Sequence, residues 1–124
     1  MIRKPKALVI EDYMDQAMVF QRALEMAGFD TEMITDGDVA RTRLTEVVPV
    51  LIVLDLHLPG MTGDYLLKQI RTDRRMHKTR VVVATADALM AQNLREQADI
   101  VLLKPISFRQ LNQLAERYYA HPKA

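Results

Sequence analysis

Val50-Leu-Ile-Val-Leu54 runs without interruption into Asp55, and Ala7-Leu-Val-Ile10 runs in the same way into Glu11-Asp12. Short apolar runs rich in Val and Ile are typical of strands that are buried on both faces of a parallel sheet. Ligands of such sheets bind just beyond the carboxyl ends of the strands. A buried strand has no structural reason to end in an acid, so we expect these acids to share one crevice.

Three carboxylates in one crevice have a direct electrostatic consequence. Like charges at short distance cost free energy unless a cation or a proton lies between them. A hard divalent ion such as magnesium prefers oxygen ligands and keeps some of its waters. The cluster of Glu11, Asp12 and Asp55 therefore indicates a magnesium site.

Length and composition limit the classes of protein to be considered. The chain has 124 residues, 49% of them hydrophobic, which suits one domain with one core. Its net charge is +1, so no strong field favours nucleic acid or a membrane surface. Cysteine is absent, and no apolar run approaches the roughly 18 residues of a membrane span. We expect a cytoplasmic location, no membrane insertion and no direct binding of nucleic acid.

Strand and helix patterns alternate along the whole chain, which predicts an α/β fold with a parallel sheet covered on both faces. Helical patterns follow each strand: Gly28 is placed to end the first helix, and Asp36 and Ser107 are placed to cap two others. The fourth helical pattern, from Ala88 to Glu96, is the weakest. The expected strands are Ala7–Ile10, Thr31–Ile34, Val50–Leu54, Val81–Ala84 and Ile100–Leu103.

Two further polar residues end expected strands. Thr85 ends the run that starts at Val81, and Lys104 follows the last run. A lysine at this edge would neutralise phosphoryl charge, and a threonine hydroxyl would donate a hydrogen bond to it. The carboxylate of Asp55, exposed by the turn at Pro59-Gly60, could then act as a nucleophile toward a phosphoryl group.

At this point the chain resembles the receiver domain of bacterial two-component response regulators, over about residues 6–119 of a single domain. The matching pieces are Leu8-Val-Ile-Glu-Asp12, Leu51-Ile-Val-Leu-Asp55, Pro59-Gly-Met-Thr-Gly63, Val81-Val-Val-Ala-Thr-Ala86 and Lys104-Pro105. The resemblance implies a flavodoxin-like (βα)5 three-layer sandwich with strand order 2-1-3-4-5. No segment resembles an effector domain, so we expect either a stand-alone receiver or a receiver from a longer protein.

The resemblance also implies roles for particular residues. The match to Asp55 accepts a phosphoryl group from a sensor histidine kinase or a phosphotransfer protein. Glu11, Asp12, Asp55 and the backbone carbonyl of His57 would hold magnesium, with manganese as a substitute. Thr85 and Lys104 would contact the phosphoryl group, and the bond before Pro105 is expected to be cis. Such a protein is not an enzyme, although it can dephosphorylate itself.

The chain departs from the family pattern at one position of consequence. Receivers usually carry Tyr or Phe three residues before the lysine, and here that position is Val101. The usual coupling of an aromatic rotamer to the threonine therefore has no equivalent. Either Val101 takes part in a different output step, or it is an ordinary strand residue and the output is read elsewhere.

Two other positions vary in the family and tune the lifetime of the phosphoryl group. They are His57 and Asp87, and the hypothesis is that both line the path of the attacking water. The alternative is a surface histidine and a helix-capping aspartate. A basic run from Arg71 to Arg80 lacks interleaved aromatic residues, so we expect a solvated loop there rather than a nucleic-acid patch.

The leading hypothesis is a phosphoryl-accepting signalling switch whose downstream effector is left open. One alternative is a pseudo-receiver that binds a partner without being phosphorylated, for which Val101 is the only support. A flavin carrier would need a phosphate-binding loop where Glu11 and Asp12 would repel phosphate. A phosphatase with an aspartyl nucleophile would carry a second Asp at position 57, which is His.

Overall fold

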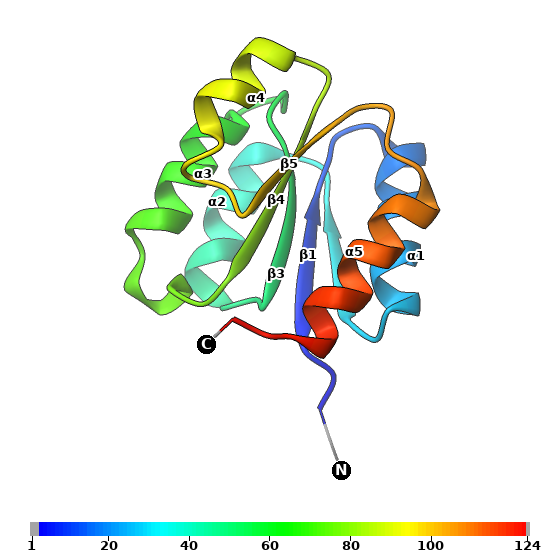
Figure 1. Ribbon diagram of the computed structural model, residues 1–124. Helices are drawn as coiled ribbons and strands as arrows, with labels where there is room; N and C mark the ends of the chain where they lie inside the picture. Colours follow the sequence, from blue (N-terminus) through cyan, green and yellow to red (C-terminus); the bar gives the residue numbers. More distant parts are fainter. Residues whose placement is uncertain (1–2, 124) are drawn as a thin grey trace.

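The computed structural model describes residues 3–123, and within them a sheet of five parallel strands forms the middle layer (Figure 1). The strand order is β2-β1-β3-β4-β5, so the predicted flavodoxin-like topology is confirmed. The strands are β1 (Lys6–Ile10), β2 (Asp30–Ile34), β3 (Leu51–Asp55), β4 (Arg80–Thr85) and β5 (Ile100–Leu103). Their bounds lie within one residue of the expected ones.

Helices cover both faces of the sheet, with α1 and α5 on one face and α2, α3 and α4 on the other (Figure 1). Because a parallel strand returns to the same sheet through a crossover, successive helices fill these two outer layers. The helices are α1 (Met14–Met26), α2 (Gly37–Glu46), α3 (Gly63–Thr72), the short 3-10 turn η1 (Arg74–Met76), α4 (Ala88–Leu94) and α5 (Phe108–Ala120).

The core has two halves, one on each side of the sheet. Successive side chains of a strand point to opposite faces. In β1, Ala7 and Val9 pack with the buried residues of α1 and α5, whereas Leu8 and Ile10 pack with those of α2, α3 and α4. All four residues are fully buried, which explains why this strand reads as a continuous apolar run instead of an alternating one.

Side chains stabilise the predicted helix starts. Asp36 accepts hydrogen bonds from the amides of Asp38 and Val39, and Ser107 accepts one from the amide of Gln110. Each of these bonds satisfies a donor that has no partner within the helix. Gly28, with φ +112°, lies just beyond α1, where the sequence predicts the helix to stop.

Helix α4 ends two residues before the expected end at Glu96. The amides of Gln97 and Ala98 both donate to the carbonyl of Leu94, at 3.0 and 3.2 Å, and close the last turn. The chain leaves the helix there because β5 begins at Ile100 and has to pair with β4.

The interpretation of the basic run as a solvated loop is wrong for Arg71 and Arg80, which lie in α3 and β4, whereas Arg75 lies in the loop and is exposed. Arg71 donates to Asp99 at 2.8 Å, and Arg75 donates to backbone carbonyls at the end of α2. The guanidinium of Arg80 lies 4.4 Å from the centre of the Tyr118 ring. These arginines hold the amino-terminal edge of the sheet together, far from the acids.

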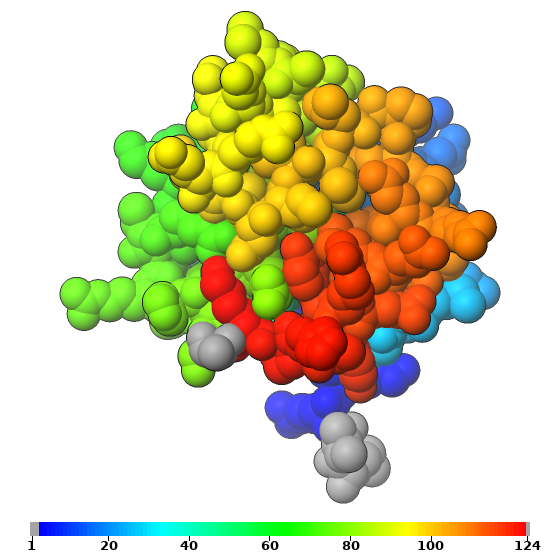
Figure 2. Space-filling model, in the orientation of Figure 1, coloured from blue at the N-terminus to red at the C-terminus, as the bar shows by residue number. Residues whose placement is uncertain are grey.

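The tail after α5 lies against the surface at the same edge (Figure 2). The carbonyl of His121 accepts a hydrogen bond from Arg80 at 3.2 Å, and Lys123 pairs with Asp99 at 3.2 Å. Among residues 3–123, none of the helices has the length and apolar character needed to cross a bilayer.

Candidate functional site

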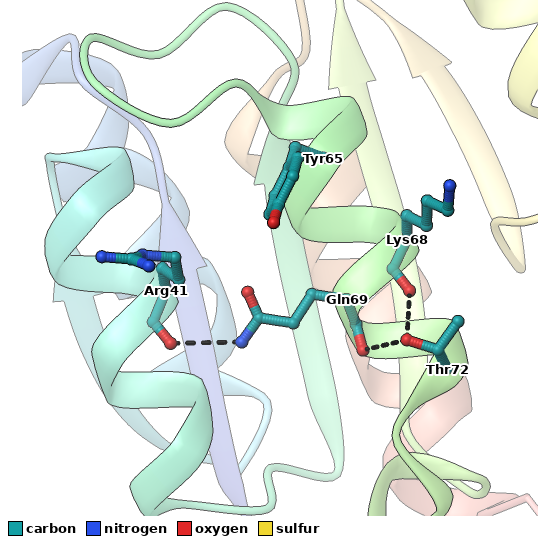
Figure 3. Close-up of a pocket in the computed structure, with 5 residues that line it drawn as sticks. All are labelled: Arg41, Tyr65, Lys68, Gln69 and Thr72. Carbon is teal, nitrogen blue, oxygen red and sulfur yellow. Dashed lines mark hydrogen bonds between the residues drawn. The ribbon is translucent and has the colours of Figure 1, made fainter.

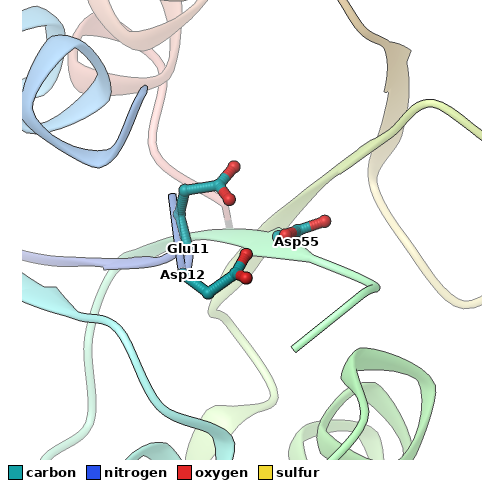
Figure 4. A group of neighbouring side chains, drawn as sticks. All are labelled: Glu11, Asp12 and Asp55. Atoms are coloured by element: carbon teal, nitrogen blue, oxygen red, sulfur yellow. The ribbon is translucent and has the colours of Figure 1, made fainter. Parts of the chain in front are cut away.

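The carboxyl ends of β1 and β3 bring the three acids together. Ile10 is paired with Leu54 in the sheet, so Glu11 and Asp55 leave adjacent strands at the same level. One carboxylate oxygen of each, and one of Asp12, lie within 4.8 Å of one another (Figure 4). Glu11 and Asp55 are buried, whereas Asp12 is exposed, so the cluster opens to solvent on one side. The expectation that the turn at Pro59-Gly60 leaves the Asp55 carboxylate exposed is therefore wrong, because Asp55 still belongs to β3 and the following loop folds back beside it.

Lys104 reaches into this cluster from the end of β5. Its Nζ donates to Oε1 of Glu11 at 2.7 Å and lies 3.6 Å from Oδ1 of Asp55. The peptide bond between Lys104 and Pro105 is cis. The ammonium group offsets part of the negative charge of the two buried carboxylates.

The electrostatics of the cluster show most clearly at Glu11. Burial raises the pKa of its carboxyl from 4.5 to about 7. The hydrogen bond from Lys104 lowers this pKa, and the neighbouring Asp55 raises it. Glu11 therefore exchanges a proton near neutral pH, because burial and a like charge together outweigh the ammonium group.

Thr85 lies at the end of β4 and is fully buried. Its hydroxyl accepts a hydrogen bond from the amide of Asp87 at 3.0 Å, which leaves the hydroxyl proton free to donate. The exposed Asp87 caps α4, where its Oδ1 accepts from the amide of Met90 at 3.0 Å. The structure thus gives Asp87 the capping role that was the alternative to a role in water attack.

The loop from Leu56 to Thr62 forms another wall of the site. The amide of His57 donates to Oδ1 of Asp55 at 3.2 Å, while its side chain is exposed. Leu56 and Leu58 are buried and tie the loop to the core. The backbone at position 57 is therefore fixed beside the acid, and the imidazole is left free.

Val101 lies in β5 opposite Val83 of β4. It is partly buried and packs against the core formed with α2, α3 and α4. Its side chain carries no polar atom, so any influence on the site passes through packing.

Sequence reasoning missed one contact at the rim of the site. The amide of Tyr13 donates to Oε2 of Glu11 at 3.3 Å, and the residue is 62% exposed. The local signal would have been its position directly after the acid pair, where the chain turns into α1. This amide helps to fix the direction of the Glu11 carboxylate.

A second concavity, of about 460 Å³, lies between α2 and α3 and is separate from the acids (Figure 3). The amide nitrogen of Gln69 donates across it to the backbone carbonyl of Arg41 at 3.1 Å. The charged ends of Arg41 and Lys68 point away from its centre (Figure 3). A hydrogen bond between the two helices thus spans this groove, and the charged groups that line it do not converge. The acidic cluster is therefore the candidate functional site.

The fold and the site together define an α/β domain with an acidic pocket at the carboxyl edge of a parallel sheet. The family described as "Response regulator receiver domain" matches residues 7–116. The chain belongs to this family, whose members are generally phosphoryl acceptors and not enzymes. Membership supports a role as a switch in two-component signalling.

Curated relatives agree with this assignment. The phosphate regulon transcriptional regulatory protein PhoB of Rhizobium meliloti is 32% identical over 110 residues, covering 86% of this chain and 48% of that protein. The probable methanogenesis regulatory protein FilR2 of Methanothrix harundinacea is 33% identical over 120 residues, covering 88% and 77%. This chain thus spans about half the length of the PhoB relative.

A solved structure supports the fold. The chemotaxis response regulator CheY4 of Vibrio cholerae matches with a TM-score of 0.83 and 23% identity, over 93% of this chain and 98% of that one.

Proposed function

We propose that this protein is a phosphoryl-accepting signalling switch and that Asp55 is the acceptor. The observation that carries the proposal is the meeting of Glu11, Asp12, Asp55 and Lys104 at one edge of the sheet. The donor is a phosphohistidine of a sensor kinase or of a phosphotransfer protein. A carboxylate oxygen of Asp55 forms the new bond to phosphorus, the phosphorus–nitrogen bond breaks, and the imidazole leaves.

Glu11, Asp12 and Asp55, with the backbone carbonyl of His57, would hold magnesium, for which manganese would substitute. The residues fit magnesium because the cluster offers only oxygen donors, which this ion prefers, and Asp12 is exposed to solvent. Magnesium, when bound, would offset the charge between the carboxylate and the phosphoryl oxygens.

Lys104 and Thr85 bind the transferred group in this proposal. The ammonium of Lys104, already 3.6 Å from Asp55, balances the added negative charge. The buried hydroxyl of Thr85 donates its free proton to a phosphoryl oxygen.

Phosphorylation then shifts an equilibrium between two conformations that both exist beforehand. His57 and Asp87 tune how long the phosphoryl group lasts, and Val101 transmits the change by packing. The relatives include proteins named as DNA-binding response regulators. For this domain we propose a protein partner and no direct contact with nucleic acid. Because the donor phosphohistidine is made from ATP, we place the exchange in the cytoplasm.

The test is to incubate the protein with magnesium and acetyl phosphate and to measure its intact mass. Asp55→Asn and a metal-free sample are the controls. The proposal requires a gain of one phosphoryl group that both controls lose.

Absence of a gain, with acetyl phosphate and with the phosphohistidine-like donor phosphoramidate, would contradict the proposal in a folded protein that binds magnesium. The chain would then be a pseudo-receiver, which acts as an interaction module without phosphorylation.

A further inference from the structure

We propose that Gly37, the first residue of α2, is a positioning residue for the acidic site. Its close backbone contact fixes the position of the loop that follows Asp55, although Gly37 belongs to a different element and touches none of the acids. This inference rests on the proposed function, because it concerns the binding of magnesium beside the backbone of His57.

The contact between Gly37 and the loop involves backbone atoms only. The amide of Gly37 donates to the carbonyl of Pro59 at 3.1 Å. A Cβ at position 37 would overlap the carbonyl oxygen of Met61 and lie 2.6 Å from its nitrogen. Unlike the end of a flexible side chain, this backbone cannot rotate away, so any side chain at position 37 would displace the loop.

The other end of the loop is fixed just as closely. The amide of Gly63 donates to the carbonyl of Leu56 at 3.0 Å, and a Cβ there would overlap the carbonyl oxygen of Asp55. The loop is thus held at the acceptor and at its tip. His57 lies between these two points, so a displaced tip changes the direction of its backbone carbonyl.

Helix α2 is not free to move away instead. Gln69 of α3 donates to the carbonyl of Arg41 halfway along the helix (Figure 3), and Arg75 donates to the carbonyls of Leu44 and Thr45 near its end. Asp36 caps its first turn. With its first turn closed by this cap and the helix tied to other elements at its middle and end, a clash at Gly37 is relieved by the loop.

The chain supplies a matched control at Gly28. A Cβ at position 28 would lie 2.8 Å from the Tyr119 ring, and the positive φ adds strain. Gly28 lies beyond α1, before the start of β2, at the edge of the sheet opposite the acids. Gly28→Ala therefore introduces the same substitution, with a clash against a side chain and backbone strain, without touching the loop.

The experiment is a calorimetric titration of wild type, Gly37→Ala and Gly28→Ala with magnesium chloride alone. Circular dichroism measures the folded fraction of each sample. We expect Gly37→Ala to weaken magnesium binding about 10-fold, the range found when groups that orient metal ligands are changed. Gly28→Ala should keep the wild-type Kd even where its melting temperature falls.

Phosphorylation by acetyl phosphate supplies the second measurement. The magnesium concentration for half-maximal rate should rise in Gly37→Ala about as much as the Kd, and saturating magnesium should restore most of the maximal rate. A merely structural role would lower the folded fraction and leave both quantities unchanged in the molecules that fold.

Equal magnesium affinity in folded Gly37→Ala and wild type overturns the inference, and so does equal weakening by Gly28→Ala. Should Gly37→Ala not fold, Gly60→Ala strains the same loop tip at φ +80°. Its only close contact is with the movable carboxylate of Asp38, at 2.5 Å, while the Asp38 nitrogen lies at an ordinary 3.5 Å. Wild-type affinity in that variant would also overturn the inference. Failure of wild type to bind magnesium would instead contradict the proposed function.

Discussion

Lys104 lies closer to Glu11 than to Asp55: its Nζ is 2.7 Å from an oxygen of Glu11 and 3.6 Å from the nearest oxygen of Asp55. The glutamate side chain is one methylene longer than that of aspartate, so it carries its carboxylate toward the lysine. The ammonium is thus held by a buried acid from β1 while it remains within reach of the proposed acceptor. This pair links the last strand of the sheet to the first.

Exchange of Lys104 for methionine should slow phosphoryl uptake by about 100-fold, the effect of losing one charged donor at a reacting group. The methionine keeps most of the length of the side chain, so the fold should persist. The measurement is the rate of mass gain with acetyl phosphate and magnesium. Lys78→Met, at an exposed position, is the control, and equal rates in the two variants would exclude this role for Lys104.

The raised pKa of Glu11, about 7, predicts that magnesium binding depends on pH. Since the metal needs the carboxylate and the proton competes for it, the affinity should fall about tenfold between about pH 8 and about pH 6. The stability of the metal-free protein should depend on pH in the opposite direction. A carboxyl whose folded pKa is raised binds its proton more tightly when folded, so stability should rise as the pH falls from about 7 toward 4.5.

Calorimetric titrations and thermal unfolding at several pH values measure both effects. In Glu11→Gln the stability of the metal-free protein should lose this dependence. A magnesium affinity that stays constant over the range would contradict the prediction.

Asp99 should stabilise the opposite edge of the sheet. Burial alone would raise its pKa, but hydrogen bonds from the Val81 amide, Arg71 and Lys123 outweigh burial and hold the pKa below its ordinary value of 3.8. Asp99→Asn should lower the free energy of unfolding by about 1–3 kcal/mol, because buried donors lose their charged acceptor. A depressed pKa means that this stabilisation is present above about pH 4 and is lost as the pH falls further.

Urea unfolding at neutral and acidic pH measures the effect of Asp99→Asn. Glu96→Gln in the same loop is exposed and should change stability by about 0.5 kcal/mol or less. Magnesium affinity should be the same in both variants, since the acids lie at the other end of the sheet. A stability loss that persists undiminished in acid would contradict the assigned charge effect.

Val101→Ala should show whether Val101 affects signal output without affecting phosphoryl uptake. The side chain is partly buried against the core, so its truncation should cost about 1 kcal/mol of stability. The rate of phosphoryl uptake should stay within about twofold of wild type, because no polar atom is lost near the acids. Intact mass and urea unfolding measure the two quantities, and a large loss of uptake would show that Val101 supports the site itself.

Local sequence signals predict much of this structure. The strands and their order follow from apolar runs and from the resemblance, and the meeting of Glu11 with Asp55 follows from strand ends that lie side by side. The seat of the loop on Gly37 could not be predicted, because position 61 is far away in the chain and its contact is through backbone atoms. The ion pair of Arg71 with Asp99 could not be predicted for the same reason, since Asp99 comes much later in the sequence.

Asp87 illustrates a residue for which the sequence allows two roles and the structure adds a means to separate them. It caps α4 through the amide of Met90, and its own amide donates to the hydroxyl of Thr85. Asp87→Ser keeps a capping oxygen and removes the carboxylate, whereas Asp87→Ala removes both. The alanine variant should therefore lose about 1 kcal/mol of stability, and the serine variant only a fraction of that.

The rate of dephosphorylation distinguishes the roles. If the carboxylate acts on the attacking water, both variants should change the rate by the same factor despite their different stabilities. The decay of the phosphorylated mass after removal of the donor gives this rate, with His57→Ala measured beside it. A wild-type rate in Asp87→Ser, together with a changed rate in Asp87→Ala, would assign the residue to the cap alone, because only the loosened start of α4 would then disturb Thr85.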